Sequence, residues 1–303
     1  MDQSAGTGQF RSGYIGIVGR PNVGKSTLLN ALLGEKVAII TNRPQTTRTR
    51  ILGIKNLPGC QMIFLDTPGI HKPMSRLNEI MVETAWKSAK DADVLLVVID
   101  AVEGITRDDR EIIDIARELE KPTLLIINKV DLVHKPTLLT LMKKCSELHD
   151  FVQLVPISAL RFENLDLLVK LIPQYLPEGP AYFPDDQFTD QTERFMATEI
   201  IREKAILQTH QELPYVIAVE LENWHEESDR DLVNIAAVIY VEKDSQKAIV
   251  IGSGGLKLRE IGRLARLDIE KLIHKKVFLE LWVKEKGSWR DDERALSQFG
   301  YEA

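Results

Sequence analysis

The stretch GRPNVGKS, residues 19–26, decides the fold of the first part of this 303-residue chain. It fits the pattern G-x-x-x-x-G-K-[ST] and connects the apolar run YIGIV to the helix-like run KSTLLNALLG. Gly19 and Gly24 allow backbone N–H groups to surround phosphates, and Lys25 can neutralise phosphate oxygens. The hydroxyl of Ser26 can ligate Mg²⁺. An ordinary glycine turn does not require this Lys-Ser pair, so the stretch predicts a nucleotide-phosphate and magnesium site.

Outward from this stretch, strand-like and helix-like runs alternate as far as about Leu176. The runs YIGIVG, CQMIFLD, VLLVVID, LLIIN and VQLVPIS are apolar on consecutive residues, as strands covered on both faces are. Strands separated by helices form a mainly parallel sheet, in which ligands lie at the carboxyl ends of the strands. The functional loops should therefore follow the strand-like runs.

Two polar stretches near the second of these runs predict contacts to Mg²⁺ and the γ-phosphate. DTPG, residues 66–69, follows CQMIFL; its aspartate can hold a Mg²⁺-bound water, and the Gly69 N–H can meet the γ-phosphate. The loop TNRPQTTRTR, residues 41–50, is of the kind that Mg²⁺ and the γ-phosphate order and that hydrolysis releases. We expect Thr47 to be the metal ligand of this loop, with Thr46 as the alternative.

The motif NKVD, residues 128–131, follows the run LLII and predicts the base. Asp131 can accept two parallel hydrogen bonds from N1–H and the 2-amino group of guanine. Adenine offers no amino group there, and sites built in this way reject the wrong partner by factors of about 10⁴. Asn128 would brace the loop, the stem of Lys129 would lie along the base, and Ala159 of the ISA motif would donate its N–H to guanine O6. In this order, the motifs predict a guanine-nucleotide site.

The composition changes at PEGPAYFPDDQFTD, residues 177–190, which carries three prolines and three aspartates and predicts an interdomain linker. After it, a helix-like run is followed by strand-like runs that end in KAIVI, by the glycine loop and helix of IGSGGLKLREIG, residues 251–262, and by the strand-like VFLELWVKEK. This order predicts a second, α+β domain. We expect KAIVI to be a strand and Leu256, Leu258, Ile261 and Leu264 to face the sheet.

The charge is unevenly distributed between the halves of the second domain. The whole chain has a net charge of −6, which argues against a surface that binds polyanions everywhere. Residues 220–231 hold six acids, whereas residues 247–286 hold ten Lys or Arg against five acids. A glycine loop that leads into a helix with Lys257 and Arg259 fits a KH fold, which clamps the backbone of single-stranded RNA. A KH-like domain that contacts protein stays open as the competing interpretation.

The remaining composition predicts a cytoplasmic protein. No apolar run approaches the length of about 18 residues that a membrane span needs, and the first dozen residues lack a signal-peptide pattern. Cys60 and Cys145 have no metal-ligand spacing, so we expect reduced thiols packed as small apolar groups.

The motifs GRPNVGKS, PQTTR, DTPGIHKP, NKVD and ISA together resemble those of the translation-factor-related GTPases, specifically the bacterial Era family, and the resemblance extends through LELWVKEKGSWRDDERALSQFGY. It implies a P-loop GTPase domain with a mainly parallel sheet and helices on both faces, followed by a smaller α+β KH domain of type II. The implied boundaries are a flexible tail at 1–12, the GTPase domain at 13–177, a linker at 178–191, and the KH domain with a C-terminal extension at 192–303.

The resemblance implies a GTPase that converts GTP to GDP and phosphate, binds 16S ribosomal RNA near its 3′ end and assists maturation of the small (30S) subunit. It also implies a monomer in the cytoplasm with transient contact to the inner membrane face. Ile70 stands where many signalling GTPases carry a water-orienting glutamine, so hydrolysis should be slow. Asn22 matches an asparagine that helps to seat K⁺ in similar GTPases, which predicts K⁺-stimulated hydrolysis.

The resemblance and the motifs together assign the site residues. Catalytic roles fall to Asn22, Lys25, Thr47 and Gly69, and metal binding falls to Ser26, Thr47 and, through water, Asp66. RNA binding is assigned to Gly252, Ser253, Gly254, Gly255, Lys257, Arg259 and Arg263. GTP-binding roles are assigned to Gly19, Arg20, Pro21, Asn22, Val23, Gly24, Lys25, Ser26, Thr27, Asp66, Thr67, Pro68, Gly69, Asn128, Lys129, Asp131, Ser158 and Ala159.

Two other classes of protein share the phosphate loop. A phosphate-loop kinase is one alternative, and NKVD argues against it. The other alternative is a signalling GTPase that acts through a protein or membrane partner, with the C-terminal domain as an adaptor. RNA contact by residues 252–266 would distinguish an RNA-binding GTPase from this signalling GTPase.

Overall fold

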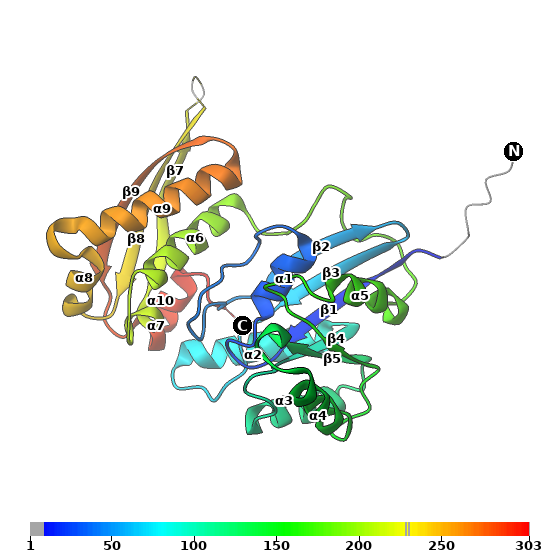
Figure 1. Cartoon of the computed structure of the whole chain (residues 1–303). Coiled ribbons are helices and arrows are strands. Elements are labelled where there is room, and N and C mark those ends of the chain that lie inside the picture. Colours follow the sequence, from blue (N-terminus) through cyan, green and yellow to red (C-terminus); the bar gives the residue numbers. More distant parts are fainter. Residues whose placement is uncertain (1–8, 228, 230, 303) are drawn as a thin grey trace, which may run out of the picture. The chain divides into compact units, whose positions relative to one another are not determined.

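The computed structural model describes residues 9–227, 229 and 231–302, which divide into two compact units (Figure 1). Unit 1 comprises the residues up to 38, 47–72 and 81–190. Unit 2 comprises 39–46, 73–80 and the chain from 191 onward. Each unit has a sheet of its own, so the predicted order of an α/β unit and a smaller α+β unit is confirmed.

The sheet of unit 1 has six strands in the order β2-β3-β1-β4-β5-β6. Only β2 runs antiparallel to its neighbour, β3, and the other pairs are parallel. Strand β2, which directly follows the polar loop at 41–50, is not among the strands that the apolar runs predict. The elements in chain order are β1 (Arg11–Val18), α1 (Lys25–Leu33), β2 (Ile51–Leu57), β3 (Cys60–Asp66), α2 (Arg76–Asp91), β4 (Val94–Asp100), α3 (Arg107–Glu118), β5 (Thr123–Asn128), α4 (Lys135–Ser146), β6 (Gln153–Pro156) and α5 (Leu165–Leu171).

The core of unit 1 explains the uninterrupted apolar strands. Every residue of β3, β4 and β5 is buried, as expected for parallel strands covered by helices. One cluster joins β4 and β5 to α2, α3 and α4, with Ala85, Ala89, Ile112, Ile113 and Cys145 contributed by the helices. Helix α1 packs on β2 and β3 and contacts α5. Because β1, β3, β5 and β6 are parallel, the loops after them lie at one edge of the sheet.

The predicted linker lies along the exposed edge of β2 within unit 1. The Ile54 N–H donates to the Phe188 carbonyl at 2.9 Å, and the Thr189 hydroxyl donates to the Leu52 carbonyl at 2.7 Å. Gly53 and Thr189 form an antiparallel bridge. The segment thus covers an edge strand that would otherwise present unpaired backbone groups.

Gln61 of β3 fastens this segment, which allows a stability prediction. Its buried side chain accepts hydrogen bonds from the N–H groups of Tyr182 and Phe183 at 2.7 and 3.0 Å and donates to the Phe183 carbonyl at 2.8 Å. Gln61→Leu would leave these backbone groups unpaired, so we expect the free energy of unfolding to fall by about 2–4 kcal/mol in urea titrations. Gln174→Leu, at an exposed position, is the control, and an equal effect of both changes would contradict the assignment.

Unit 2 has a three-stranded sheet in the order β7-β8-β9, with β7 antiparallel and β9 parallel to β8. A parallel neighbour requires a crossover, and two helices with the glycine loop between them provide it. The elements in chain order are α6 (Glu193–Leu207), α7 (Leu213–Val216), β7 (Ala218–Glu226), β8 (Leu232–Val241), α8 (Asp244–Ile251), α9 (Leu256–Ile273), β9 (Lys276–Glu285) and α10 (Glu293–Gln298).

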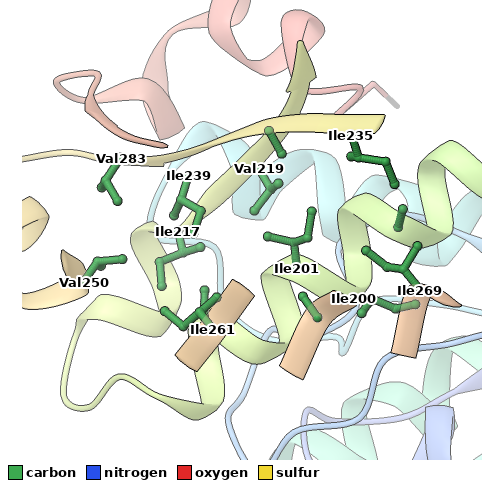
Figure 2. Close-up of a cluster of buried hydrophobic side chains, with 14 of the residues drawn as sticks. Ile200, Ile201, Ile217, Val219, Ile235, Ile239, Val250, Ile261, Ile269 and Val283 are labelled. Atoms are coloured by element: carbon green, nitrogen blue, oxygen red, sulfur yellow. The ribbon is translucent and has the colours of Figure 1, made fainter. Parts of the chain in front are cut away.

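Figure 2 shows the core of unit 2, in which side chains from helices that include α6, α8 and α9 meet one face of the sheet. The buried residues of α9 recur every four positions, which places them on one side of the helix. The core members labelled in the figure are Ile200, Ile201, Ile217, Val219, Ile235, Ile239, Val250, Ile261, Ile269 and Val283.

The prediction that KAIVI is a strand is wrong, because these residues belong to helix α8. The Gln246 side chain accepts hydrogen bonds from the N–H groups of Glu242 and Lys243, both at 3.0 Å, and so starts the helix. Val250 is fully buried in the core of unit 2. Packing of this kind overrides the β preference of branched residues. The glycine loop therefore connects two helices.

Other expectations concern the chain's start, its cysteines and membranes. Strand β1 begins at Arg11, so the predicted tail at 1–12 reaches into the strand, and residues 1–8 of it lie outside the described residues. Cys60 and Cys145 are free and buried, as expected, and burial raises the pKa of Cys145 to about 11. Within the described part of the chain, no helix combines the length and the apolar character that a membrane span requires.

Candidate functional site

The phosphate loop holds Lys25 at the start of α1. The Lys25 ammonium group is buried and donates to the carbonyls of Gly19 and Arg20 at 3.0 and 2.9 Å. Burial lowers its pKa to about 8, and the nearby Asp66 carboxylate opposes this shift. Gly24 has a φ of 98°, and a Cβ there would lie 2.3 Å from the Asn128 amide nitrogen. The loop therefore requires glycine at position 24. The backbone carbonyls of the loop position the Lys25 ammonium group, which can bind an anion.

Three oxygen-bearing side chains converge beside this lysine. The Ser26 hydroxyl donates to Asp66 Oδ2 at 2.6 Å, and it lies 2.8 Å from the Thr47 hydroxyl. The other carboxylate oxygen, Asp66 Oδ1, is buried and has no hydrogen-bond partner among the described residues. Burial raises the pKa of Asp66 to about 6, against the opposing charge of Lys25. Hydroxyl and carboxylate oxygens with an unpaired acceptor suit a hard divalent cation such as Mg²⁺.

The two threonines of the polar loop have different partners. The Thr46 hydroxyl lies 2.6 Å from the Thr41 hydroxyl and donates to the Arg43 carbonyl at 2.7 Å, within its own loop. Thr47 is buried and lies next to Ser26. The geometry therefore favours Thr47 as the threonine nearer to a metal held by Ser26.

The DTPG loop packs directly on the phosphate loop. The Thr67 hydroxyl donates to the Ile17 carbonyl at 2.8 Å, and the Ile70 N–H donates to the Gly19 carbonyl at 3.1 Å. A Cβ on Gly69 would lie 2.6 Å from the Pro21 nitrogen, so only glycine fits this approach. The Ile70 side chain is buried in the cluster that joins β4 to its helices. It cannot orient a water molecule by hydrogen bonding.

Asn128 connects three loops at the base end of the site. Its amide nitrogen donates to the Val23 carbonyl of the phosphate loop at 2.9 Å, and its amide oxygen accepts from the Ala159 N–H at 3.0 Å. Ser158, beside it, is buried. Asp131 is exposed in the short turn after β5, where its carboxylate is accessible to a base.

Asp100 is a site residue that the sequence analysis missed. It ends β4 and forms an ion pair with Lys129, whose Nζ lies 2.6 Å from Asp100 Oδ2. Lys129 itself has a left-handed backbone with a φ of 66°. The signal that could have identified Asp100 was an acid directly after a fully apolar run, as at Asp66.

The predicted nucleotide residues thus lie in four neighbouring loops of unit 1, after β1, β3, β5 and β6, together with the segment before β2 that carries Thr47. Within the phosphate loop, Asn22 is exposed with a left-handed φ of 65°. Pro68 of the DTPG motif is buried, and Thr27 lies in the first turn of α1.

The glycine loop of unit 2 contains glycines with different constraints. Gly252 has a φ of 73°, and a Cβ there would lie 2.7 Å from the Cβ of Lys257. Gly254 and Gly255 also have positive φ, but a Cβ on either would meet nothing within 4 Å. Ser253 and Gly254 are exposed. The loop is therefore closed on one side by Lys257 and open at its tip.

A groove of about 410 Å³ runs from this loop between α9 and β9. Three of the predicted RNA-binding residues line the groove, namely Gly255, Arg259 and Arg263. The other four do not line it: Gly252, Ser253, Gly254 and Lys257. The further lining residues are Leu258, Gly262, Arg266, Leu279 and Leu281. Sequence patterns could not show that Leu279 and Leu281 of β9 would face α9.

Two of the arginines that line the groove have acidic partners. Arg263 pairs with Glu260 at 2.8 Å, and Arg266 lies 3.6 Å from Glu270, so both cations have acidic neighbours on α9.

The expectation that Leu256 faces the sheet is wrong, since this side chain is 64% exposed at the start of the helix.

Comparisons with known proteins match both units. A family model described as "50S ribosome-binding GTPase" matches residues 14–129, and a model described as "KH domain" matches residues 212–290. The GTPase Era of Syntrophus aciditrophicus is 51% identical over 304 residues, which cover 99% of each chain.

Solved structures match at similar length. A crystal structure of Era in complex with MgGDPNP and nucleotides 1506–1542 of 16S ribosomal RNA is 44% identical, with a TM-score of 0.94, and the match covers 97% of this chain and 100% of that one. A variant of Era from Aquifex aeolicus, bound to GDP·AlF₄⁻, has the same identity, TM-score and coverage. Identity of this size over nearly the whole length shows common descent of both units. The chain belongs to the Era family of GTPases.

Proposed function

We propose that this chain is a GTP-hydrolysing switch that binds 16S ribosomal RNA near its 3′ end and assists maturation of the small ribosomal subunit. The observation that carries this proposal is the pairing of a guanine-nucleotide site in unit 1 with an arginine-lined groove beside a glycine loop in unit 2. Neither element alone would distinguish this function from that of a signalling GTPase.

The phosphate site would hold Mg²⁺ through the Ser26 and Thr47 hydroxyls, with Asp66 acting through a metal-bound water. The bound ion would supply positive charge to the β- and γ-phosphates. Lys25 would meet the same oxygens while its ammonium group remains bonded to the backbone of the loop. The relative solved with MgGDPNP supports this arrangement, because that ligand is a magnesium complex of a GTP analogue.

The base site would select guanine through Asp131, which is accessible and follows the loop fixed by Asn128. The Ala159 N–H donates to Asn128 Oδ1 at 3.0 Å in this structure, so it would have to share or exchange this hydrogen bond to meet guanine O6. Lys129 forms an ion pair with Asp100, and its aliphatic stem would cover one face of the base. These contacts would act together to exclude adenine.

Hydrolysis would need charge stabilisation that Ile70 cannot provide, and we propose that K⁺ beside Asn22 provides it. Asn22 is exposed in the phosphate loop, where its side chain is free to help seat a cation. We expect kcat to be about 100-fold higher in K⁺ than in Na⁺, comparable to the effect of removing one charge-stabilising donor.

Asn22→Gly tests this role, because glycine accepts the left-handed backbone of Asn22 without strain. The variant should bind GTP but hydrolyse it at the same slow rate in both salts. Equal rates of the unmodified chain in K⁺ and Na⁺ would refute the proposal.

The RNA partner is proposed from the solved relative and from the groove together. The family model's description mentions the 50S particle, whereas the relative's complex contains 16S RNA of the small subunit. We favour 16S RNA, because that relative matches 97% of the chain, including unit 2, while the family model covers only part of unit 1.

The function is tested with oligonucleotides of the 16S 3′ end and a scrambled control of equal length. We expect the specific RNA to bind more tightly than the control, with affinity that falls steeply as salt is raised. GTP hydrolysis is measured in the same samples. Crosslinking of RNA to residues 252–266 would support the KH groove. Equal binding of both oligonucleotides would contradict recognition of the 3′ end, and binding of neither would favour the signalling alternative.

A further inference from the structure

The phosphate loop is anchored from outside the nucleotide site by helix α3. Arg20 Nε donates to Asp109 Oδ1 at 2.8 Å, and Arg20 Nη1 donates to Glu103 Oε2 at 2.9 Å. The Asp109 side chain is only 1% exposed, compared with 55% for Glu103. Asp109 is therefore the buried partner, and a buried charge-assisted bond contributes more than an exposed one.

The Asp109 carboxylate is itself held by the first turn of α3. Its Oδ2 accepts hydrogen bonds from the Thr106 N–H at 2.9 Å and the Thr106 hydroxyl at 2.8 Å, while its own N–H donates to that hydroxyl at 3.3 Å. This reciprocal cap fixes one carboxylate oxygen and leaves the other facing Arg20. The anchor on α3 is thus rigid.

The anchored residue also contacts the lysine that meets the phosphates. The carbonyl of Arg20 accepts from Lys25 Nζ at 2.9 Å, beside the carbonyl of Gly19 at 3.0 Å. A continuous series of hydrogen bonds therefore runs from Asp109 through Arg20 to Lys25. The guanidinium of Arg20 is paired with Asp109 of α3 and with Glu103, so Arg20 does not act as an arginine finger in this arrangement.

We propose that Asp109 is a positioning residue for GTP hydrolysis, acting through Arg20 to fix the loop carbonyls that orient Lys25. This inference rests on the GTPase activity proposed above. Loss of the Asp109 charge would leave the exposed Glu103 as the remaining ion-pair partner of Arg20. The Nη2 atom of Arg20 is already buried without a hydrogen-bond partner among the described residues. The loop would then move, and displacements of about 1 Å at a reacting group can reduce rates by up to about 100-fold.

The test compares Asp109→Asn with the unmodified chain. The amide keeps the size of the carboxylate and can still accept from Thr106, so α3 should retain its cap. We expect kcat for GTP to fall by about tenfold while GTP affinity changes less, because misplacement of Lys25 affects the transition state most. A purely electrostatic effect of the unbalanced Arg20 charge would instead tighten binding of both GTP and GDP.

Three further variants separate positioning from stability. Thr106→Ala removes the hydroxyl bonds to Asp109 but keeps the Thr106 N–H bond and the ion pair, so it should lower the urea midpoint and reduce kcat less than Asp109→Asn does. Asp108→Asn, at the exposed neighbouring position, should change neither. In an Arg20→Met background, Asp109→Asn should have no further effect on kcat, because the two residues act in one series.

The outcomes distinguish this inference from the function on which it rests. An Asp109→Asn variant with the kcat of the unmodified chain and only a lower urea midpoint would overturn the positioning role. An additive effect of the two changes in the double variant would also overturn it. An unmodified chain that hydrolyses no GTP would instead overturn the proposed function itself.

Discussion

Asp131→Asn is expected to convert the base preference of this chain from GTP to xanthosine triphosphate. The carboxylate of Asp131 accepts from N1–H and the 2-amino group of guanine, and an amide in its place can donate to the 2-oxygen of xanthine. Because guanine would then face the amide without its bidentate acceptor, we expect GTP affinity to fall by about 100-fold or more. Competition of both nucleotides against a fluorescent guanine nucleotide measures the shift.

The structure indicates that this change would act on the base and not on the fold. Asp131 is exposed in a short turn, whereas the loop is held by Asn128 and by the ion pair of Lys129 with Asp100. Asp166→Asn, at an exposed position of α5, is the matched control and should leave both affinities unchanged. A variant at Asp131 that still prefers GTP would contradict the assignment of the base site.

The nucleotide site was largely predictable because each of its motifs is local. The parallel order of β1, β3, β5 and β6 brings the carboxyl ends of these strands to one edge, so four short motifs come together without any further signal. The exact partners could not be predicted. Asp100 and Asp109 are acids in ordinary positions of the sequence, and only the folded chain places them beside Lys129 and Arg20.

The second unit was harder to predict because packing, not local pattern, decides its details. KAIVI has the branched residues of a strand, yet Gln246 starts a helix there and Val250 fills the core. Leu256 precedes the periodic face of α9 and is therefore exposed. The apolar side of the groove comes from β9, and no spacing in the sequence links Leu279 to α9.

Gly254→Asp is expected to weaken binding of single-stranded RNA by a factor of about 30, corresponding to a repulsion of about 2 kcal/mol between the new carboxylate and a phosphate held at the loop. A Cβ at Gly254 has open space around it. Its φ of 57° is a conformation that aspartate and asparagine tolerate better than most residues. The change should therefore add charge to the loop without unfolding unit 2.

Gly254→Asn is the control, since it has the same shape and backbone tolerance but no charge. We expect it to bind RNA nearly as well as the unmodified chain, and we expect the defect of Gly254→Asp to shrink as salt is raised, because mobile ions screen the repulsion. Fluorescence anisotropy with a labelled 16S 3′-end oligonucleotide measures both. Equal losses in the two variants would indicate a steric effect, and no loss in either would exclude a phosphate clamp at this loop.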